Sequence, residues 1–531
     1  MEEEKNEVKT NENNKRELIE VTQKIEARKE KIKNWLKDPS NLIFIGIIIF
    51  AIAIRLYYFF LTKNQPLWWD EGEYGLKAKA FAFGTPATGW YGAREIVVPF
   101  LFSLVLRFGG TEVVFRFVQL IVSCATIFVL YLLAKEMFNR RIALISTLIL
   151  SVNAVHLFFT CRILTYLWAP FFFVLSFYLF YQGYINGKSK KYLYSFAVIA
   201  ALGLSTYGSL AFGLLAIVVF LFITERFNFL KKKELWLTAG IGFLCLIPQF
   251  IYSQIAYGTP IGRWAGLQSS KPENNFSLIF DYFKLMPHLF GKIFVVLILV
   301  GAIYILFTLL VSYDLILKNQ HKNLKSYLLI FLWALAVLGF YTYISVGWGV
   351  TYDGFVLSSL PALAVIGAVG LNLIYNIKFN KVILTLILIV ILIFGAYNQV
   401  VYADSMIKNK MTSFDGVKYA GEWINQNSNK GDIIISSSLP QMTYYSERET
   451  YPYTRYTSVE DDPTIRNNES DFDNFVALKK PRFITDSLFE NVPPWVHAYA
   501  SKHNNTLIPV QVYFMDAQKT QPSIIIYVVK Y

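Results

Sequence analysis

Long apolar segments between Asn41 and Tyr402 constrain the fold of this chain more than any other feature. About eleven can be distinguished, and most approach the ~20 residues that a helix needs to cross a bilayer. Hydrophobic residues make up 55% of the sequence and charged residues 16%, against about 25% charged in typical soluble domains. The sequence therefore predicts a polytopic α-helical membrane protein. The predicted spans are roughly residues 42–62, 112–134, 142–160, 165–183, 192–207, 208–225, 235–257, 291–312, 326–346, 355–375 and 382–402.

The distribution of charge argues against nucleic-acid binding and predicts a membrane orientation. Residues 1–40 carry ten basic and ten acidic side chains, and residues 405–531 carry thirteen and fourteen. Of the 50 basic and 37 acidic residues, 27 and 13 therefore remain in the membrane region, where the basic ones gather in alternate connections. Short basic loops stay in the cytoplasm. We expect a cytoplasmic N-terminus and extracytoplasmic loops at 63–111, 258–290 and 347–354, together with an extracytoplasmic C-terminal tail.

Residues 94–108 are apolar but are not predicted to span the membrane. The segment is only about fifteen residues long and opens with Arg94-Glu95, which is short for a spanning helix. A span here would also invert every later basic connection, against the positive-inside rule. We therefore expect an interfacial or re-entrant helix within the first external loop.

Composition divides the chain into three parts. Residues 1–40 are a charged segment that predicts a solvated cytoplasmic helix, and residues 41–404 form the membrane module. In residues 405–531, β-rich runs alternate with helical patterns, which is typical of a small α/β domain. The expected strands are 432–437, 482–486, 507–514 and 523–529, with helices near 417–424 and 494–503.

An acidic tract directly follows the first predicted span. Residues 68–74 read Trp-Trp-Asp-Glu-Gly-Glu-Tyr and place Asp70, Glu71 and Glu73 among aromatic side chains. Carboxylates so close to hydrocarbon are costly and often functional. A solvated loop with an aromatic belt at the lipid headgroups is the alternative interpretation.

Cations occur in the same predicted external loops. Arg94, Arg162 and Arg263 lie in three different loops, and together with a carboxylate they suit transfer from a phosphorylated donor. The carboxylate takes the proton of an incoming hydroxyl, and the guanidiniums stabilise the departing phosphate. Arginines also anchor membrane interfaces, which is the plainer interpretation.

No cofactor is required by the sequence. Glu95 and His288 are weak candidate ligands for a divalent metal, and a lone loop histidine more often serves only as a hydrogen-bonding residue.

The arrangement of these residues resembles the GT-C glycosyltransferases. The likeness consists of the Asp-Glu pair in the first external loop, a short helix from Gly75 to Ala82, the re-entrant piece, and Phe115-Arg116 opening a span that ends at 132–138. It is similar above all to the protein O-mannosyltransferase and aminoarabinose transferase group. The resemblance implies a GT-C fold with a soluble C-terminal domain.

Individual residues carry over from this resemblance. Asp70 matches the acidic residue that activates the acceptor, and Glu71 is the second member of the pair. Glu95 stands where the aminoarabinose branch has the glutamate of a donor-side Glu-Lys-Pro-Pro motif, but the lysine and the paired prolines are missing. The acidic residue usual in the second external turn is also missing, because this chain has Cys161-Arg162 there.

The resemblance implies transfer of a sugar from a polyprenyl-phosphate carrier to a protein or glycolipid acceptor, with inversion at the anomeric carbon. A transporter or lipid flippase without covalent chemistry is the alternative, although such proteins often contain inverted repeats, and none is evident in this sequence. A sensory membrane protein with an external domain is a third class, which would not need the Asp-Glu pair.

Overall fold

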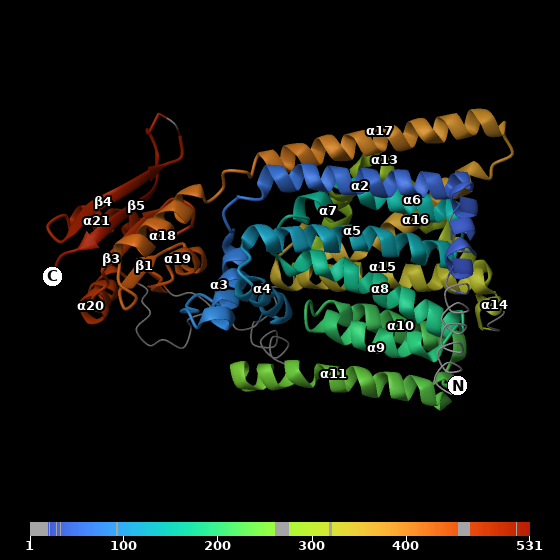
Figure 1. The fold of residues 1–531 in the computed structure, drawn as a ribbon, viewed down its shortest axis with the longest axis horizontal. Helices are drawn as coiled ribbons and strands as arrows, with labels where there is room; N and C mark the ends of the chain where they lie inside the picture. The colour runs from blue at the N-terminus through green and yellow to red at the C-terminus, as the bar shows by residue number, and fades with distance from the viewer. Residues whose placement is uncertain are drawn as a thin grey trace, which may run out of the picture.

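The chain forms a bundle of helices followed by an α/β domain at one end of the bundle (Figure 1). The computed structural model describes the following residues: 20, 22–27, 29–31, 33–91, 94–260, 275–317, 321–454, 468–516 and 518–531. The helices of the bundle are α2 (Pro39–Thr62), α3 (Trp69–Phe83), α4 (Val97–Arg107), α5 (Glu112–Met137), α6 (Arg140–Val152), α7 (Ala154–Phe159), η1 (Thr165–Leu167), α8 (Trp168–Phe180), η2 (Tyr181–Ile185), α9 (Lys190–Leu204), α10 (Leu210–Glu225), η3 (Asn228–Lys231), α11 (Lys233–Tyr257), η4 (Phe276–Phe280), α13 (Asp281–Val311), α14 (Tyr313–Leu317), α15 (Lys322–Trp348), η5 (Asp353–Ser359), α16 (Leu360–Tyr375) and α17 (Lys381–Lys408).

The prediction of a polytopic helical membrane protein is confirmed. Among the described residues, seven helical stretches are long and apolar enough to cross a bilayer. They are α2, α5, α11, η4 with α13, α15, η5 with α16, and α17. The other four predicted spans correspond to shorter or interrupted helices, namely α6 with α7, α8 with η2, α9, and α10.

Helix α4 is the apolar segment that was not expected to span. It has 11 residues and is about 16 Å long at ~1.5 Å per residue, whereas the hydrocarbon core of a bilayer is ~30 Å thick. Helices α3 and α4 lie at the end of the bundle that adjoins the C-terminal domain, and α2 begins at the opposite end (Figure 1). The acidic tract and the C-terminal domain are therefore at the same end of the bundle.

A buried arginine stabilises a break in the predicted span 142–160. Asn153 leaves the helical conformation between α6 and α7, with φ −58° and ψ 121°, and its side chain caps α7 by accepting from the His156 backbone N–H at 2.9 Å. Arg55 of α2 donates to the carbonyl of Ser151 at 3.0 Å and to the hydroxyl of Ser123 at 2.7 Å. Because a free carbonyl is costly in hydrocarbon, Arg55 supplies the partner that the interrupted helix lacks.

Burial differs strongly among the long helices. In the apolar stretch of α16, 94% of the residues are buried, against 6% in α11. Helix α16 packs closely on α13, and there is no room for a Cβ at Gly301 or Gly370, where the two backbones meet. Helix α11 lies at the edge of the bundle (Figure 1). The core is therefore centred on α16.

The C-terminal domain has a mixed five-stranded sheet in the order β2-β1-β3-β5-β4. Strands β1, β2 and β3 are parallel, and β5 runs antiparallel to both of its neighbours. The predicted α/β domain is confirmed, but the sequence prediction missed β2, α19 and α20. The elements are α18 (Asp415–Asn427), β1 (Ile433–Ser436), α19 (Leu439–Ser446), β2 (Glu449–Tyr451), α20 (Glu469–Lys479), β3 (Phe483–Ser487), α21 (Pro494–Lys502), β4 (Leu507–Phe514) and β5 (Pro522–Val529).

Candidate functional site

The three carboxylates of the acidic tract lie in the first turns of α3 but have different environments. The side chain of Asp70 is 34% exposed, whereas those of Glu71 and Glu73 are 0% and 1% exposed. Residues three or four apart share a helix face, so Asp70 and Glu73 point to one side and Glu71 to another. Asp70 is therefore the carboxylate of this tract that a substrate can reach.

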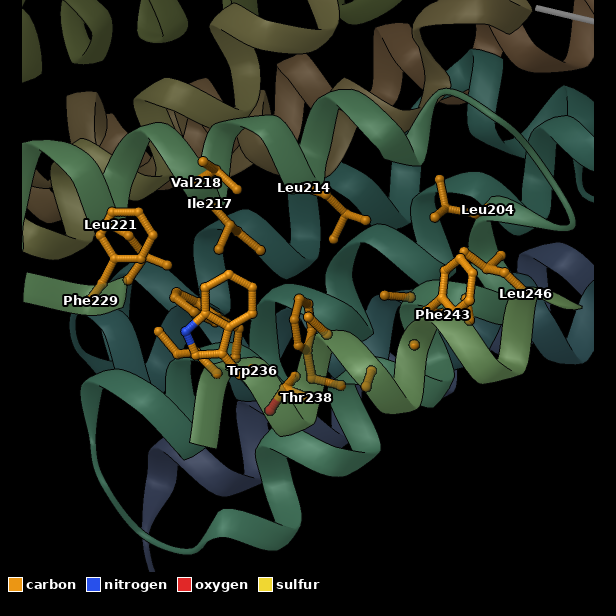
Figure 2. Close-up of a pocket in the computed structure, with 18 of the residues that line it drawn as sticks. Leu204, Leu214, Ile217, Val218, Leu221, Phe229, Trp236, Thr238, Phe243 and Leu246 are labelled. Carbon is orange, nitrogen blue, oxygen red and sulfur yellow. The ribbon is translucent and has the colours of Figure 1, made fainter. Parts of the chain in front are cut away.

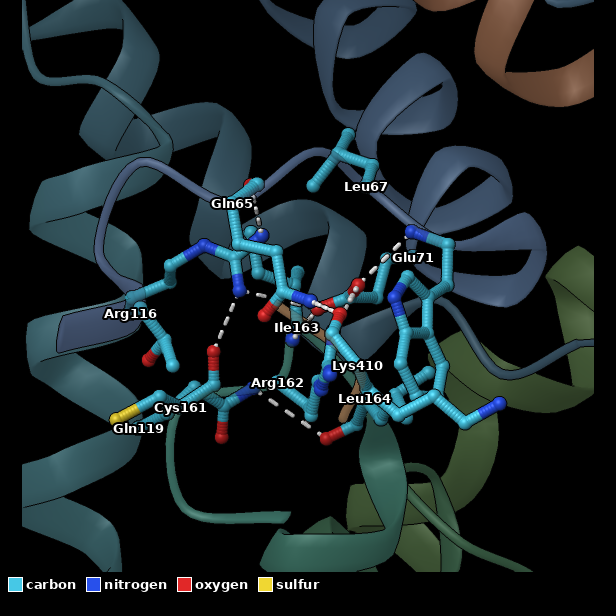
Figure 3. Close-up of polar contacts among 12 residues, drawn as sticks. Gln65, Leu67, Glu71, Arg116, Gln119, Cys161, Arg162, Ile163, Leu164 and Lys410 are labelled. Carbon is cyan, nitrogen blue, oxygen red and sulfur yellow. Dashed lines mark hydrogen bonds and ion pairs between the residues drawn. The ribbon is translucent and has the colours of Figure 1, made fainter. Parts of the chain in front are cut away.

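Glu71 binds the polypeptide rather than solvent. Its Oε1 accepts from the backbone N–H of Ile163 at 2.7 Å, and its Oε2 accepts from the backbone N–H of Trp68 at 2.9 Å. Two guanidiniums also lie beside it: Nη1 of Arg116 is 3.4 Å from Oε1 of Glu71, and Nη1 of Arg162 is 3.6 Å from Oε2 (Figure 3). Glu71 therefore ties the start of α3 to α5 and to the turn after α7.

The two arginines around Glu71 are themselves buried. Arg116 donates to the carbonyls of Cys161 at 2.7 Å and Gln65 at 2.9 Å. The guanidinium of Arg162 lies 3.5 Å from the centre of the Trp68 ring. Burial lowers the pKa of Arg162 to about 10, although the Glu71 carboxylate opposes this shift. Arg162 thus remains a cation at neutral pH, next to Glu71 of the acidic tract.

Arg94 links the two carboxylates on the other face of α3. Its Nη2 lies 2.7 Å from Asp70 Oδ1, and its Nε binds Glu73 Oε2. The ring of Tyr74 lies 5.2 Å from the guanidinium. Burial opposes the charge of Arg94, but Tyr74, Asp70 and Glu73 together outweigh burial and hold the pKa of Arg94 above its usual range. Asp70 is thereby oriented by a fixed cation, and the Tyr166 hydroxyl lies 3.5 Å from its other oxygen.

Four of the predicted site residues converge and the others do not. Asp70 is paired with Arg94 and Glu71 with Arg162, on different faces of the first turns of α3. Glu95 instead accepts from the backbone N–H of Gly208 at 3.2 Å, at the turn between α9 and α10. Arg263 lies outside the described residues. Glu73 was recognised in the acidic tract but was given no role of its own. Arg116, which contacts Glu71, and Tyr166, which contacts Asp70, were not expected at the site.

His288 forms a separate pair. Its Nε2 lies 2.9 Å from Asp353 Oδ2, and its Nδ1 contacts the hydroxyl of Tyr402. Within the described ranges, no three His, Cys, Asp or Glu side chains are grouped so that they could hold a metal ion. Both ring nitrogens of His288 are therefore engaged by protein groups.

An apolar groove of about 430 Å³ runs between α9, α10 and α11 (Figure 2). The residues that line it include Leu204, Leu214, Leu221, Phe229, Trp236 and Phe243. At the end near Leu204, Glu95 contacts the turn at Gly208, and Trp90 Nε1 lies 3.3 Å from the Tyr252 hydroxyl of α11. Tyr207 of the same turn packs against Tyr166, with 5.7 Å between the ring centres. Residue contacts thus link the turn between α9 and α10, next to the groove, to Tyr166 beside Asp70.

Comparison with known proteins gives a family match for part of the chain and a fold for most of it. Residues 94–252 match the family model of the dolichyl-phosphate-mannose-protein mannosyltransferases. Among curated protein sequences none matches the chain. The match covers α4 to α11, together with Arg94, Glu95 and Arg162, but not Asp70.

Two solved structures share the fold over most of the chain. ArnT from Cupriavidus metallidurans, solved bound to undecaprenyl phosphate, is 14% identical, with a TM-score of 0.62 over 91% of this chain and 98% of ArnT. AglB, the oligosaccharyltransferase of Archaeoglobus fulgidus, was solved with an inhibitory peptide and a dolichol-phosphate. It is 13% identical, with a TM-score of 0.61 over 85% of this chain and 70% of AglB. The chain is thus a multi-pass membrane protein with the fold of ArnT and AglB, and its residues 94–252 are similar to the dolichyl-phosphate-mannose-protein mannosyltransferase family.

Proposed function

We propose that the chain transfers a sugar from polyprenyl phosphate to a hydroxyl or amine of a protein or envelope glycolipid, on the extracytoplasmic face, with Asp70 as the general base. The exposure of Asp70 carries this proposal, since its two acidic neighbours are buried. A general base has to reach the proton that it abstracts. Glu71 supports the base by fixing the first turn of α3.

The reaction requires one proton transfer and one displacement at carbon. The acceptor oxygen or nitrogen loses its proton to Asp70 and forms a bond with the anomeric carbon, and the bond from that carbon to the phosphate oxygen breaks. The electron pair of the broken bond leaves with polyprenyl phosphate. Attack opposite the leaving group inverts the anomeric configuration. Because a phosphate leaves readily, no separate general acid is needed.

Arginines are proposed to bind the donor phosphate. Arg94 shares its charge between Asp70 and Glu73 before reaction. When Asp70 takes the acceptor proton and becomes neutral, more of the charge of Arg94 is available to the departing phosphate. A guanidinium also offers bidentate donors to phosphate oxygens. Arg162 adds a buried cation below the tract, and we retain Arg263 and Glu95 as donor-side residues.

The apolar groove between α9, α10 and α11 supports a site for the polyprenyl chain of the donor. Its lining is almost entirely hydrocarbon and aromatic, which suits an isoprenoid chain. The contacts of Glu95 and Trp90 connect its outer end to the acidic tract. ArnT and AglB were solved with undecaprenyl phosphate and dolichol-phosphate, respectively, which supports a lipid donor of the same chemistry.

The test of this function is a comparison of cell-envelope glycoproteins and glycolipids by mass spectrometry, with and without the protein. We expect a hexose or pentose to be missing from at least one acceptor when the protein is absent. Complementation with Asp70→Asn should fail, because loss of a general base costs about 10² in rate or more. Asp281→Asn is the matched control, since Asp281 forms a surface pair with Lys284. Normal glycosylation by Asp70→Asn would refute the assignment of the base.

A further inference from the structure

Helix α19 of the C-terminal domain is packed against the helix that carries Asp70. All eight residues from Leu439 to Ser446 are buried, including Gln441 and Thr443, which are polar. Helices α19 and α3 lie side by side at the junction of the domain with the bundle (Figure 1). The burial of this polar helix results from its packing both against α18 of its own domain and against α3.

Two glycines allow the two helices to approach closely. A Cβ built on Gly75 would lie 2.9 Å from Tyr444 Cε2, and one built on Gly72 would lie 3.1 Å from the backbone nitrogen of Gln441. Distances this short leave no room for a side chain. The spacing of three residues places both glycines on one face of α3, so α19 rests directly on the α3 backbone.

Polar contacts fix α19 on both sides of these glycines. The backbone N–H of Leu67, just before α3, donates to the Tyr445 hydroxyl at 2.8 Å. Farther along α3, Lys79 Nζ donates to the carbonyl of Tyr444 at 2.9 Å and lies 2.7 Å from a carboxylate oxygen of Glu447. The contacts bracket the turn that contains Asp70, so both the rotation and the translation of α3 are restrained.

Gly72 and Gly75 lie on the side of α3 that faces away from Asp70. Successive helical residues are rotated by about 100°, so Gly72 is turned about 200° and Gly75 about 140° from Asp70. On the other faces, Glu71 and Glu73 are held by arginines of the membrane region. Helix α3 is therefore held by the membrane region and by the C-terminal domain from different directions.

We propose that α19 is a positioning element for the general base, and that Tyr445, whose hydroxyl accepts from the Leu67 backbone N–H, is a positioning residue for transfer. The proposal rests on the role assigned to Asp70. A shift of about 1 Å in a reacting group costs up to ~10² in rate, and the contact with α19 prevents such a shift of α3. The soluble domain thus belongs to the catalytic apparatus, besides any role in contacting acceptors.

The test is a pair of opposing substitutions in the full-length protein in nanodiscs. Gly75→Ala introduces a Cβ 2.9 Å from the Tyr444 ring and 3.0 Å from Leu67 Cδ1, and Gly75→Ala/Tyr444→Leu removes the ring that is closer. Hydrogen exchange of the α3 amides from Glu71 to Gly75 is measured for both. We expect faster exchange in the single variant and recovery in the double variant. Gly431→Ala is the control, because a Cβ there meets nothing within 4 Å.

Turnover of polyprenyl-phosphate mannose with an envelope extract provides the second readout. Per folded molecule, Gly75→Ala should lower kcat by about 10- to 100-fold, with the KM for donor unchanged, and the double variant should recover most of kcat. Wild-type exchange in Gly75→Ala, or loss of kcat that Tyr444→Leu does not rescue, would overturn the proposal. A wild-type protein without transferase activity would contradict the proposed function instead, and the exchange data would still decide whether α19 holds α3.

Discussion

Replacing Glu71 with glutamine should destabilise the protein, whereas the same type of change at the adjacent Asp70 should not. Glu71 is fully buried between Arg116 and Arg162 and accepts a backbone N–H on each oxygen. In Glu71→Gln, either orientation of the amide sets an NH₂ group against an N–H donor. The change also removes the carboxylate that both guanidiniums contact.

The expected magnitudes differ by several kcal/mol. Removing one partner of a buried ion pair costs about 3–5 kcal/mol of unfolding free energy. Asp70 is 34% exposed, and its partner Arg94 keeps the ion pair with Glu73, so Asp70→Asn should cost about 1 kcal/mol or less. Per folded molecule, Asp70→Asn should lose more transferase activity than Glu71→Gln, because Asp70 is the proposed base.

The assay is the fraction of monodisperse protein that remains in detergent after heating, measured by size-exclusion chromatography. The matched control is Glu234→Gln, which breaks an exposed pair with Lys190 and should leave the midpoint unchanged. If Glu71→Gln is as heat-resistant as the wild type while Asp70→Asn is not, the roles assigned to the two carboxylates are wrong.

Three further outcomes are expected. Arg94→Ala and Arg162→Ala should each raise the concentration of lipid donor needed for half-maximal transfer in proteoliposomes, and the lysine variants should recover only a fraction of the loss because an ammonium lacks bidentate geometry. Phe83→Cys and Asn468→Cys, each in a background without the native cysteines, should both react with an impermeant thiol reagent from outside the cell, and protection of one alone would break the predicted topology. Burial holds the pKa of Glu490 above its usual range, against three serine hydroxyls. The folded state thus keeps a proton that the unfolded chain loses above about pH 4.3. The melting temperature should therefore fall as the pH rises from about 4.3 to the higher pKa of Glu490 in the folded protein. Glu490→Gln should flatten this dependence of the melting temperature on pH.

The sequence predicted elements well where hydrophobic periodicity is long or strongly alternating. The four expected strands of the C-terminal domain match β1, β3, β4 and β5. Helix α19 was missed because its residues, Leu-Pro-Gln-Met-Thr-Tyr-Tyr-Ser, show no amphipathic stripe. Its burial depends on contacts with α18 and with α3, and α3 is more than 350 residues away along the chain. Single-sequence patterns do not report such contacts.

The candidate site shows the same limit. The tract at residues 68–74 pointed to Asp70 and Glu71 together, because adjacent carboxylates look alike in a sequence. Only the contacts with Ile163 and Arg116 separate a buried structural carboxylate from an exposed one. Arg116 was missed as a site residue since an arginine near the end of an apolar span resembles an interface anchor. The alternative of a transporter is replaced by the family match of residues 94–252.

The unequal burial of α16 and α11 has a consequence for how a lipid reaches the site. A polyprenyl chain that comes from the bilayer has to pass between neighbouring helices of the bundle. Moving α13 away from α16 would pull apart the backbones that meet at Gly301 and Gly370 and would forfeit close-packed contacts across the whole core. Helix α11 has only 6% of its apolar stretch buried and borders the groove, so its displacement exposes little that was not already in contact with lipid. We therefore expect the proposed polyprenyl donor to enter beside α11, while the packing of α13 on α16, and with it the position of Asp70, stays unchanged.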